Sequence, residues 1–355
     1  MKKHLTTIFV FLVFALVGFL SYKFLFTDIL NNPKEKYTAH NRVLIETEFE
    51  REFLFDVVND SVYRGMELSN NSANFFVSDF GDYYIKQFDF AGNFVSKIGN
   101  GYGRGPGEFQ NITDFDVSES YIWAADMNNF RISRFSIFNA SDVLEVNTEN
   151  MPARIATNGN VTAVKWMISD QFFTLFNNQG QKLFSFGKIS DDQVQNAFTY
   201  DGWIDISENH LFFIPISFGQ IFVFELEDGE LIKIIDTPEN SEKPELEEQV
   251  RNNQRIVTAP STQYRNSDIL YIPNKNLLAV SSYYRGNKIG DDSFDLESAK
   301  FWIDFYDLNT WEYRNSISLP HAVSSFFFFN EILYTYNTTS AAGRSYKLSS
   351  AVLNQ

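Results

Sequence analysis

The chain has 355 residues, of which 44% are hydrophobic, so it can bury the core of one large domain or of two ordinary ones and is not disordered as a whole. Its formal charge of −16 repels phosphate backbones, and we therefore expect no nucleic-acid partner. The absence of cysteine excludes disulfides, thiolate metal sites, cysteine nucleophiles and an acylated-cysteine anchor. With only four histidines in the chain, we expect no three-histidine metal site. The 38 Phe, 17 Tyr and 5 Trp favour β-strands.

Residues 1–26 predict a signal anchor. Lys2 and Lys3 precede an apolar run from Leu5 to Leu20, the pattern of an export signal. No Ala-x-Ala cleavage site follows, which favours an uncleaved anchor over the alternative, a cleaved signal peptide. The positive-inside rule then places everything after residue 30 outside the cytoplasm, on the periplasmic side of an inner membrane. The polar residues 27–41 predict a tether that leads to one domain, residues 42–355.

Two segments near the start of that domain share one pattern. Asn74–Gly99 and Ser120–Val146 each contain an apolar strand, an aspartate, a turn and two further strands. The two aspartates, Asp79 and Asp126, are 47 residues apart. Similarity at a period of about 40–50 residues, with about four strands in each unit, is typical of the blades of a β-propeller.

Weaker copies of the pattern follow along the chain. They cover Asp170–Gly187, Asn209–Asp236, Asn274–Leu319 with an insertion, and Asn330–Val352. We count six units between about residue 60 and the C-terminus. The chain otherwise shows little sign of amphipathic helix. The exception is Lys243–Val257, whose acidic start and basic end predict a helix.

Six units must close into a ring, because an open sheet edge would otherwise be exposed. The last unit is one strand short, and the segment Arg42–Phe49 is an unassigned strand near the start. We predict that this strand joins the sixth unit. The fold class is therefore all-β, a six-bladed β-propeller closed by an N-terminal strand in the last blade.

One segment resembles a known family. The sequences GRGPGEF, DFDV and YIWAADMNNFRISRF, at residues 103–109, 114–117 and 121–135, resemble the NHL-type repeat of six-bladed β-propellers. The match is close over Asn74–Val146, and elsewhere only the period and pattern agree. The resemblance assigns these positions to repeat architecture: Asp79, Lys86, Gly105, Pro106, Gly107, Asp126 and Arg131. The signal and the degenerate later units also look like the envelope propellers of Bacteroidetes bacteria, many of which are lipoproteins, although this chain has no lipobox cysteine.

The glycine-rich segment Ile98–Asn111 is not a nucleotide-binding loop. A dinucleotide fingerprint needs Gly-x-Gly-x-x-Gly before a helix, but Pro106 occupies the third glycine position and an alternating strand follows. A P-loop would need Lys followed by Ser or Thr, which is absent. We interpret the segment as a link between two blades, where glycine provides the tight bends.

The lengths of the loops favour one face of the propeller. If the four strands of a blade are named a to d from the axis outward, the a–b and c–d turns are short. The long excursions are the link Ile98–Asn111, a d-to-a insertion over Thr237–Asn266, and a b–c insertion over Arg285–Ser298. All three fall on the face that carries the b–c loops, and we infer that this long-loop face is the functional one.

Candidate binding residues lie in or directly beside two of these excursions. They are Tyr102, Arg104, Tyr283, Tyr284, Arg285, Asp291 and Asp292. The tyrosines and arginines suit stacking on a sugar or a peptide, and the alternative is a solvated loop. Asp291 and Asp292 suggest a calcium loop only weakly, because Gly290 precedes the acids and the EF-hand spacing is not met. The run Phe326–Phe329 predicts a strand buried between blades.

Asp79 and Asp126 have two interpretations. They are either carboxylates around the central channel that bind calcium, or caps of the turns that follow them, and their recurrence at equal positions favours the caps. We assign no catalytic or metal-ligating residue. The expected function is binding of, or scaffolding for, a protein, peptide or glycan. The alternatives are a purely structural role in a larger assembly and, as the resemblance implies, a calcium-dependent lyase or lactonase with its site in the channel.

Overall fold

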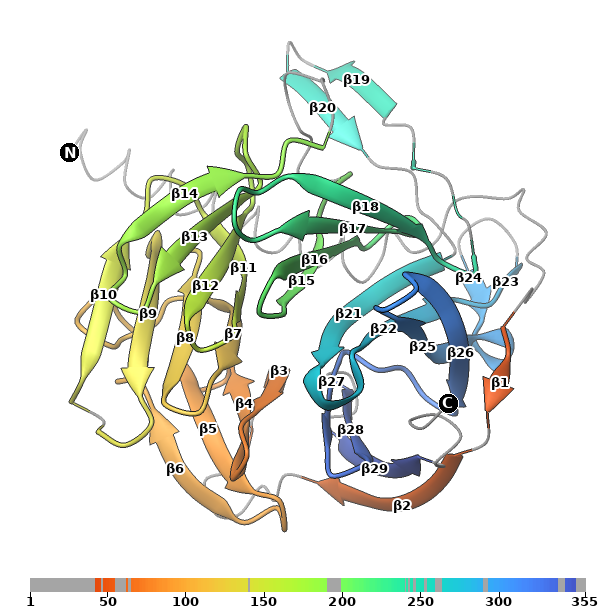
Figure 1. Cartoon of the computed structure of the whole chain (residues 1–355), viewed down its shortest axis with the longest axis horizontal. Coiled ribbons are helices and arrows are strands. Elements are labelled where there is room, and N and C mark those ends of the chain that lie inside the picture. Colours follow the sequence, from red (N-terminus) through yellow and green to blue (C-terminus); the bar gives the residue numbers. More distant parts are fainter. Residues whose placement is uncertain are drawn as a thin grey trace.

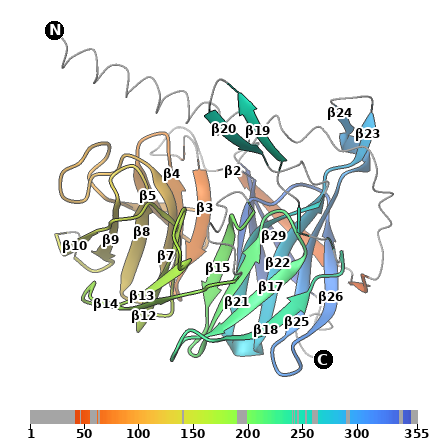
Figure 2. The same cartoon turned by 90° about the horizontal axis from the view of Figure 1, so that it is seen from above.

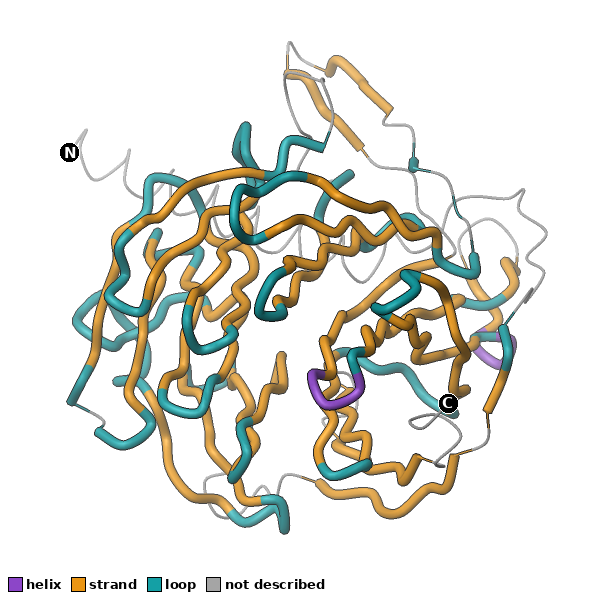
Figure 3. The backbone as a smooth tube through the Cα atoms, in the orientation of Figure 1, coloured by secondary structure: helices purple, strands orange, loops and turns teal. Residues whose placement is uncertain are grey.

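The computed structural model describes residues 42–45, 47–54, 62, 65–139, 141–189, 199–239, 241, 243–244, 247–251, 254–258, 264–289, 293–337 and 342–348. Six sheets are arranged in a ring around a central axis (Figure 1), so the predicted all-β six-bladed propeller is confirmed. In the described part of the chain, the helices are two short 3-10 turns, Pro273–Lys275 and Leu296–Ser298. The backbone trace shows how strands dominate the molecule (Figure 3).

Blades 1 to 4 are meanders of four antiparallel strands, and each uses one continuous stretch of sequence. Blade 1 contains β3 (Gly65–Asn70), β4 (Asn74–Asp79), β5 (Tyr84–Asp89) and β6 (Phe94–Ile98). Blade 2 contains β7 (Ile112–Val117), β8 (Tyr121–Asp126), β9 (Arg131–Ser136) and β10 (Val143–Asn147). Blade 3 contains β11 (Pro152–Thr157), β12 (Val161–Trp166), β13 (Phe173–Asn177) and β14 (Lys182–Phe186). Blade 4 contains β15 (Gly202–Ile206), β16 (His210–Pro215), β17 (Gln220–Glu225) and β18 (Leu231–Asp236).

Blades 5 and 6 complete the ring and receive strands from the N-terminal segment. Blade 5 contains β21 (Tyr264–Ile272), β22 (Leu277–Tyr284), β25 (Lys300–Asp307), β26 (Glu312–Leu319) and a short fifth strand, β1 (Leu44–Ile45). Blade 6 contains β27 (Ser325–Phe329), β28 (Ile332–Asn337), β29 (Ala342–Leu348) and β2 (Thr47–Leu54). The predicted buried strand at Phe326–Phe329 is thus β27, the innermost strand of its blade.

Closure of the ring by an N-terminal strand is confirmed, with different bounds from those predicted. The strand of blade 6 is β2, whose pairing with β29 runs from Thr47 opposite Leu348 to Leu54 opposite Ala342. The preceding pair Leu44–Ile45 instead lies parallel to β26 of blade 5. The predicted strand Arg42–Phe49 is therefore divided between two blades, because β26 leaves a free edge beside the path to β29.

Two insertions form separate hairpins that rise from one face of the wheel (Figure 2). The first pairs β19 (Glu247–Arg251) with β20 (Gln254–Thr258), and the second pairs β23 (Asn287–Ile289) with β24 (Ser293–Asp295). The helix predicted over Lys243–Val257 is therefore wrong. The acid-to-base gradient that suggested a helix dipole, from Glu247 and Glu248 to Arg251 and Arg255, fits a hairpin with an acidic first strand and a basic second strand equally well.

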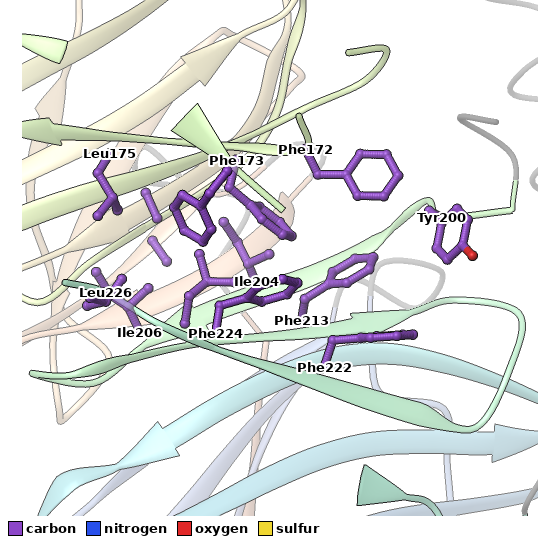
Figure 4. Close-up of a cluster of buried hydrophobic side chains, with 14 of the residues drawn as sticks. Phe172, Phe173, Leu175, Tyr200, Ile204, Ile206, Phe213, Phe222, Phe224 and Leu226 are labelled. Carbon is purple, nitrogen blue, oxygen red and sulfur yellow. The ribbon is translucent and has the colours of Figure 1, made fainter. Parts of the chain in front are cut away.

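Each interface between neighbouring blades has its own apolar cluster, and six clusters fill the six interfaces. Strand β8 shows how this works, since Ile122 and Ala124 pack toward blade 1 while Trp123 and Ala125 pack toward blade 3. A central strand is therefore covered on both sides, which explains the continuous apolar runs in the sequence. Between blades 3 and 4 the cluster is largely phenylalanine (Figure 4).

Candidate functional site

The glycine-rich link between blades 1 and 2 is held in place by the two residues that the repeat pattern places after it. Arg131 donates to the carbonyl oxygens of Arg104 and Gly105 and also forms an ion pair with Glu145 at 2.8 Å. Asn129 donates to the carbonyl of Gly103 at 2.9 Å. Gly107 has a φ of 73°, and a Cβ there would lie 2.8 Å from Asn100 Nδ2. The link is therefore a fixed connection, built without the phosphate-binding geometry that a loop–helix junction would provide.

The first group of candidate residues lies on this link. Tyr102 is 60% exposed, and its ring packs on Tyr83 with centroids 4.8 Å apart. Tyr83 in turn packs on Phe80 at 5.1 Å, so the b–c loop of blade 1 and the link share an aromatic row. Arg104 is exposed and donates to Gln110 Oε1 at 3.2 Å. This part of the long-loop face therefore presents the exposed ring of Tyr102 and, two residues further along the link, the exposed Arg104.

The second group lies in blade 5, with blade 6 between it and Tyr102. Tyr284 is buried and its hydroxyl donates to Asn287 Oδ1 at 3.0 Å, and Arg285 is also buried. Burial and the neighbouring Arg265 lower the pKa of Arg285 to about 9. Tyr283 is half-buried against Phe301. Tyr284 and Arg285 therefore do not present their side chains on the surface, and Asp291 and Asp292 lie outside the described residues.

Asp79 and Asp126 do not line the central channel. Asp79 is fully buried, accepts a hydrogen bond from the Gly81 amide at 2.8 Å, and pairs with Lys86 Nζ at 2.7 Å. Asp126 accepts from the backbone amides of Gln110, Asn111 and Asn129. Both carboxylates are therefore used to hold turns and links, which is a structural use of the repeat positions.

The carboxylates that do surround the axis were missed in the sequence. The innermost strands of blades 1, 2, 4 and 5 place them on the channel wall, and they are Glu67, Asp114, Asp116, Asp205 and Asp268. The matching position on blade 3 is Arg154, whose guanidinium stacks on Trp203 of blade 4 at 3.8 Å. The available signal was an acid that precedes an apolar residue in the innermost strand, as in Asp114-Phe115 and Asp116-Val117 of blade 2.

Four of these carboxylates bridge neighbouring blades in the same way. One oxygen accepts from the amide of the next residue in its own strand, and the other accepts from an amide on the innermost strand of the following blade. The interblade donors are Ile155 to Asp114 (2.9 Å), Thr157 to Asp116 (2.7 Å), Tyr271 to Asp205, and Phe326 to Asp268 (3.0 Å). These interblade hydrogen bonds, which we call staples, connect blade 2 to blade 3, blade 4 to blade 5, and blade 5 to blade 6.

Hydroxyl groups and Arg154 serve the remaining interfaces. Ser69 donates to Asp116 at 2.8 Å between blades 1 and 2, and the Leu68 amide donates to Ser325 Oγ at 3.0 Å between blades 6 and 1. The stacking of Arg154 on Trp203 joins blades 3 and 4. Every interface thus has a polar bridge at the axis and an apolar cluster outside it.

The channel is too small and too fully engaged for a sugar-sized substrate. The space enclosed among these strands is about 70 Å³, which has room for a few water molecules. In the part of the chain that the structure describes, no three His, Cys, Asp or Glu side chains are placed together to hold a metal ion. We call the five channel carboxylates the hub. Four of them accept hydrogen bonds from backbone amides of the following blade.

Burial changes the acidity of the hub. Loss of water raises the pKa of Asp114 to about 7, of Asp116 to about 6 and of Asp268 to about 8. The same cause, with the charges of neighbouring acids, raises the pKa of Glu67 and Asp205 well above the ordinary range. Several hub acids therefore keep their proton in the folded protein near neutral pH, whereas they lose it on unfolding.

A pH dependence of stability follows. The folded chain binds more protons than the unfolded chain between the unfolded carboxyl pKa of about 4 and the raised values near 7–8, so stability falls as pH rises through this window. We expect the thermal midpoint to decrease from about pH 6.5 to about pH 8.5. His321, whose pKa burial lowers to about 4, is neutral in the folded state throughout this range, and its protonation in the unfolded chain opposes the decrease only near the lower end. Calorimetry at several pH values measures this slope.

Matched variants test whether the hub carboxylates cause this pH dependence. Asp268→Asn cannot titrate and should flatten the slope, at the cost of one staple. Asp89→Asn is the control, because Asp89 is exposed to solvent at its surface turn and its hydrogen bonds to Asn93 lower its pKa, which places its titration at acid pH. A wild-type midpoint that is constant or rises over this range would contradict the account.

None of the helices in the described residues is long and apolar enough to cross a membrane. The predicted anchor at residues 1–26 and tether at residues 27–41 lie outside those residues, so both stay predictions, as does the domain boundary at residue 42.

Comparison with known proteins rests on the fold. No protein-family model matches the chain, and no curated protein matches its sequence. A DUF4221 family member from Bacteroides vulgatus is similar in structure, with a TM-score of 0.60 at 13% identity, over 86% of this chain and 99% of that one. A Bacteroides fragilis protein whose name marks it as a candidate exported protein aligns with a TM-score of 0.49 at 14% identity, over 86% and 87% of the two chains. Hydrazine synthase of Kuenenia stuttgartiensis also aligns at 0.49, with 10% identity, over 88% and 99%. What the first of these shows is the fold, which this chain shares as a six-bladed β-propeller.

Proposed function

We propose that the protein is a binding or scaffold propeller of the cell envelope, which holds a peptide, glycan or protein partner over its long-loop face. Its location outside the cytoplasm rests on the export signal predicted in residues 1–26. The relation to NHL-type repeats is part of the same proposal and rests on the pattern over Asn74–Val146. The wheel supplies a rigid platform, and the loops supply the contacts.

The observation that carries the proposal is the placement of the long segments. The hairpins β19–β20 and β23–β24 and the glycine-rich link all connect strands on the face opposite the short a–b and c–d turns (Figure 2). A two-stranded ribbon is marginally stable by itself. Two such ribbons on one side of a rigid ring are typical of segments that serve recognition rather than the ring's own stability.

The aromatic row on the same face suits either a peptide or a sugar. The ring centroids of Phe80 and Tyr83 are 5.1 Å apart, and those of Tyr83 and Tyr102 are 4.8 Å apart. Tyr102 is exposed. Aromatic residues and arginine, here Tyr102 and Arg104, are enriched at binding surfaces.

Replacing Arg285–Ser298 by Asn-Gly tests the proposal. Tyr284 and Lys300 already pair across β22 and β25, so the three-residue loop Asn-Gly-Ala299 can close this hairpin and leave the blade intact. On glycan and peptide arrays, we expect the full-length wild type to bind at least one class of probe and the hairpin variant and Tyr102→Ala to lose that signal.

Phe138→Ala is the control, because Phe138 is 80% exposed on a c–d turn of the other face and should leave the array signal unchanged. Equal array signals for the wild type and both long-loop variants, with folding verified by circular dichroism, would contradict the proposal.

A further inference from the structure

A second cavity in the described part of the chain lies away from both the hub and the long loops. A crevice of about 510 Å³ opens between blades 3 and 4 on the face of the short turns. Pockets of about 300–1,000 Å³ are the usual size for small ligands and side-chain anchors. The proposed function does not use this face, so the crevice is an independent feature.

The two walls of the crevice differ in chemistry. The blade-3 wall is apolar, and its residues are Val161, Leu175, Leu183 and Phe184. The blade-4 wall carries three carboxylates from the turns and strand ends, Glu208, Glu225 and Glu227, above Leu226. No lysine or arginine lines the crevice. An occupant must therefore offer both an apolar body and positive charge.

The crevice is preformed. Asn158 at its base donates to the carbonyl of Ser207 at 2.7 Å and thereby ties the blade-3 turn to the blade-4 turn. The Asn158 side-chain oxygen accepts from the amides of Asn160 and Val161, which fixes the side chain itself. The two walls are thus fixed relative to each other by this hydrogen bond and need no ligand to take their positions.

The carboxylates at the rim are not neutralised from within. Glu225 lies 3.3 Å from His210, whose ring is in edge contact with Trp311. Glu208 and Glu227 form no ion pair with any residue in the described part of the chain. Leu183, 48% exposed, lies on the opposite wall. An exposed leucine facing unpaired carboxylates is a surface that a cationic, partly apolar partner would cover.

We propose that this crevice binds a short basic peptide segment in which apolar residues alternate with lysine or arginine. The apolar side chains cover Leu183 and Phe184, and the cations pair with Glu208 and Glu227. A sugar is a poorer match because the lining has one phenylalanine and no tryptophan or tyrosine on which a pyranose ring would stack. An anionic ligand is excluded by the carboxylates.

Binding of the labelled peptide acetyl-Leu-Lys-Leu-Lys-Leu-Lys-amide to the full-length protein, followed by fluorescence anisotropy at low salt, tests the proposal. We expect the double variant Glu208→Gln/Glu227→Gln to weaken binding about five- to ten-fold, since two partly exposed ion pairs are lost. Leu183→Ser should weaken it about three-fold without unfolding, because the side chain is already half exposed. The peptide with glutamine in place of lysine should not bind.

The matched control is Glu149→Gln/Glu312→Gln, which removes the same charge from two exposed sites elsewhere. It should change the affinity less than about two-fold. Equal weakening by both double variants would mean that the peptide is attracted only by the net charge, and this result would overturn the proposal. Absence of binding by the wild type at about millimolar peptide would overturn it too.

Discussion

Arg42→Met is expected to lower the free energy of unfolding by about 3–5 kcal/mol, the usual effect of removing one partner of a buried ion pair. The Arg42 side chain is 3% exposed and that of Asp304 is fully buried. Its guanidinium donates to both oxygens of Asp304, at 2.7 and 2.8 Å, lies 4.0 Å from the ring of Trp302, and pairs with Glu239. Without Arg42, the donors to Asp304 among the described residues would be neutral, the hydroxyls of Ser282 and Ser316.

The position of Arg42 explains why the effect should be large. It precedes β1 and β2, the strands that cross from blade 5 to blade 6, so the ion pair fixes the start of the segment that closes the ring. Chemical denaturation of Arg42→Met, Asp304→Asn and the double variant measures the coupling, and the double variant should lose much less than the sum of the single losses.

Arg104→Met is the control, since the Arg104 side chain is exposed and donates to Gln110 Oε1, and the substitution should change stability little. If Arg42→Met lowers the free energy of unfolding no more than the control does, the ion pair between Arg42 and Asp304 does not stabilise the ring.

Phe213→Ala is expected to lower the free energy of unfolding by about 3–5 kcal/mol through the cavity it leaves. Phe213 lies on β16 of blade 4 and is fully buried. Its ring contacts Phe172 and Phe173 of blade 3, with centroids 6.2 and 5.5 Å apart, and Phe222 of its own blade at 5.9 Å (Figure 4). The residue therefore links two blades, and its loss should weaken their interface.

Phe138→Ala makes the same chemical change at a position that is 80% exposed and should change the stability by less than about 0.5 kcal/mol. Denaturant titrations of both variants give the comparison. Similar losses for the two substitutions would contradict the packing of blades against each other at this cluster.

The sequence predicted the ring better than the hub. The recurrence of Asp79 and Asp126 marks equal positions in blades 1 and 2, and the length of the chain then sets the number of blades. Asp205 and Asp268 could not be found in this way, because each lies alone in a different local sequence and its partner amide is some 58–66 residues away. Such bridges become visible only when neighbouring blades are placed side by side.

For the candidate binding residues the structure gives exposure alone. Tyr102 and Arg104 are exposed, whereas Tyr284 and Arg285 are buried, and a binding role for any of them stays a prediction. Arg42 and the crevice between blades 3 and 4 gave no signal, since a single arginine and a few leucines and glutamates acquire meaning only from residues on other strands. A helix at Lys243–Val257 was predicted from charge alone, which does not distinguish a helix from a two-stranded ribbon.

The central claim, that partners bind over the long-loop face, is tested most directly by photo-crosslinking in cells that produce the protein. A photoreactive amino acid is placed in turn at Tyr102 and Asn287 on that face and at Phe138 on the outer edge of the other, all three positions being exposed. We predict discrete crosslinked adducts from the first two positions and none from Phe138. Adducts from Phe138 alone, or from none of the three, would contradict the claim.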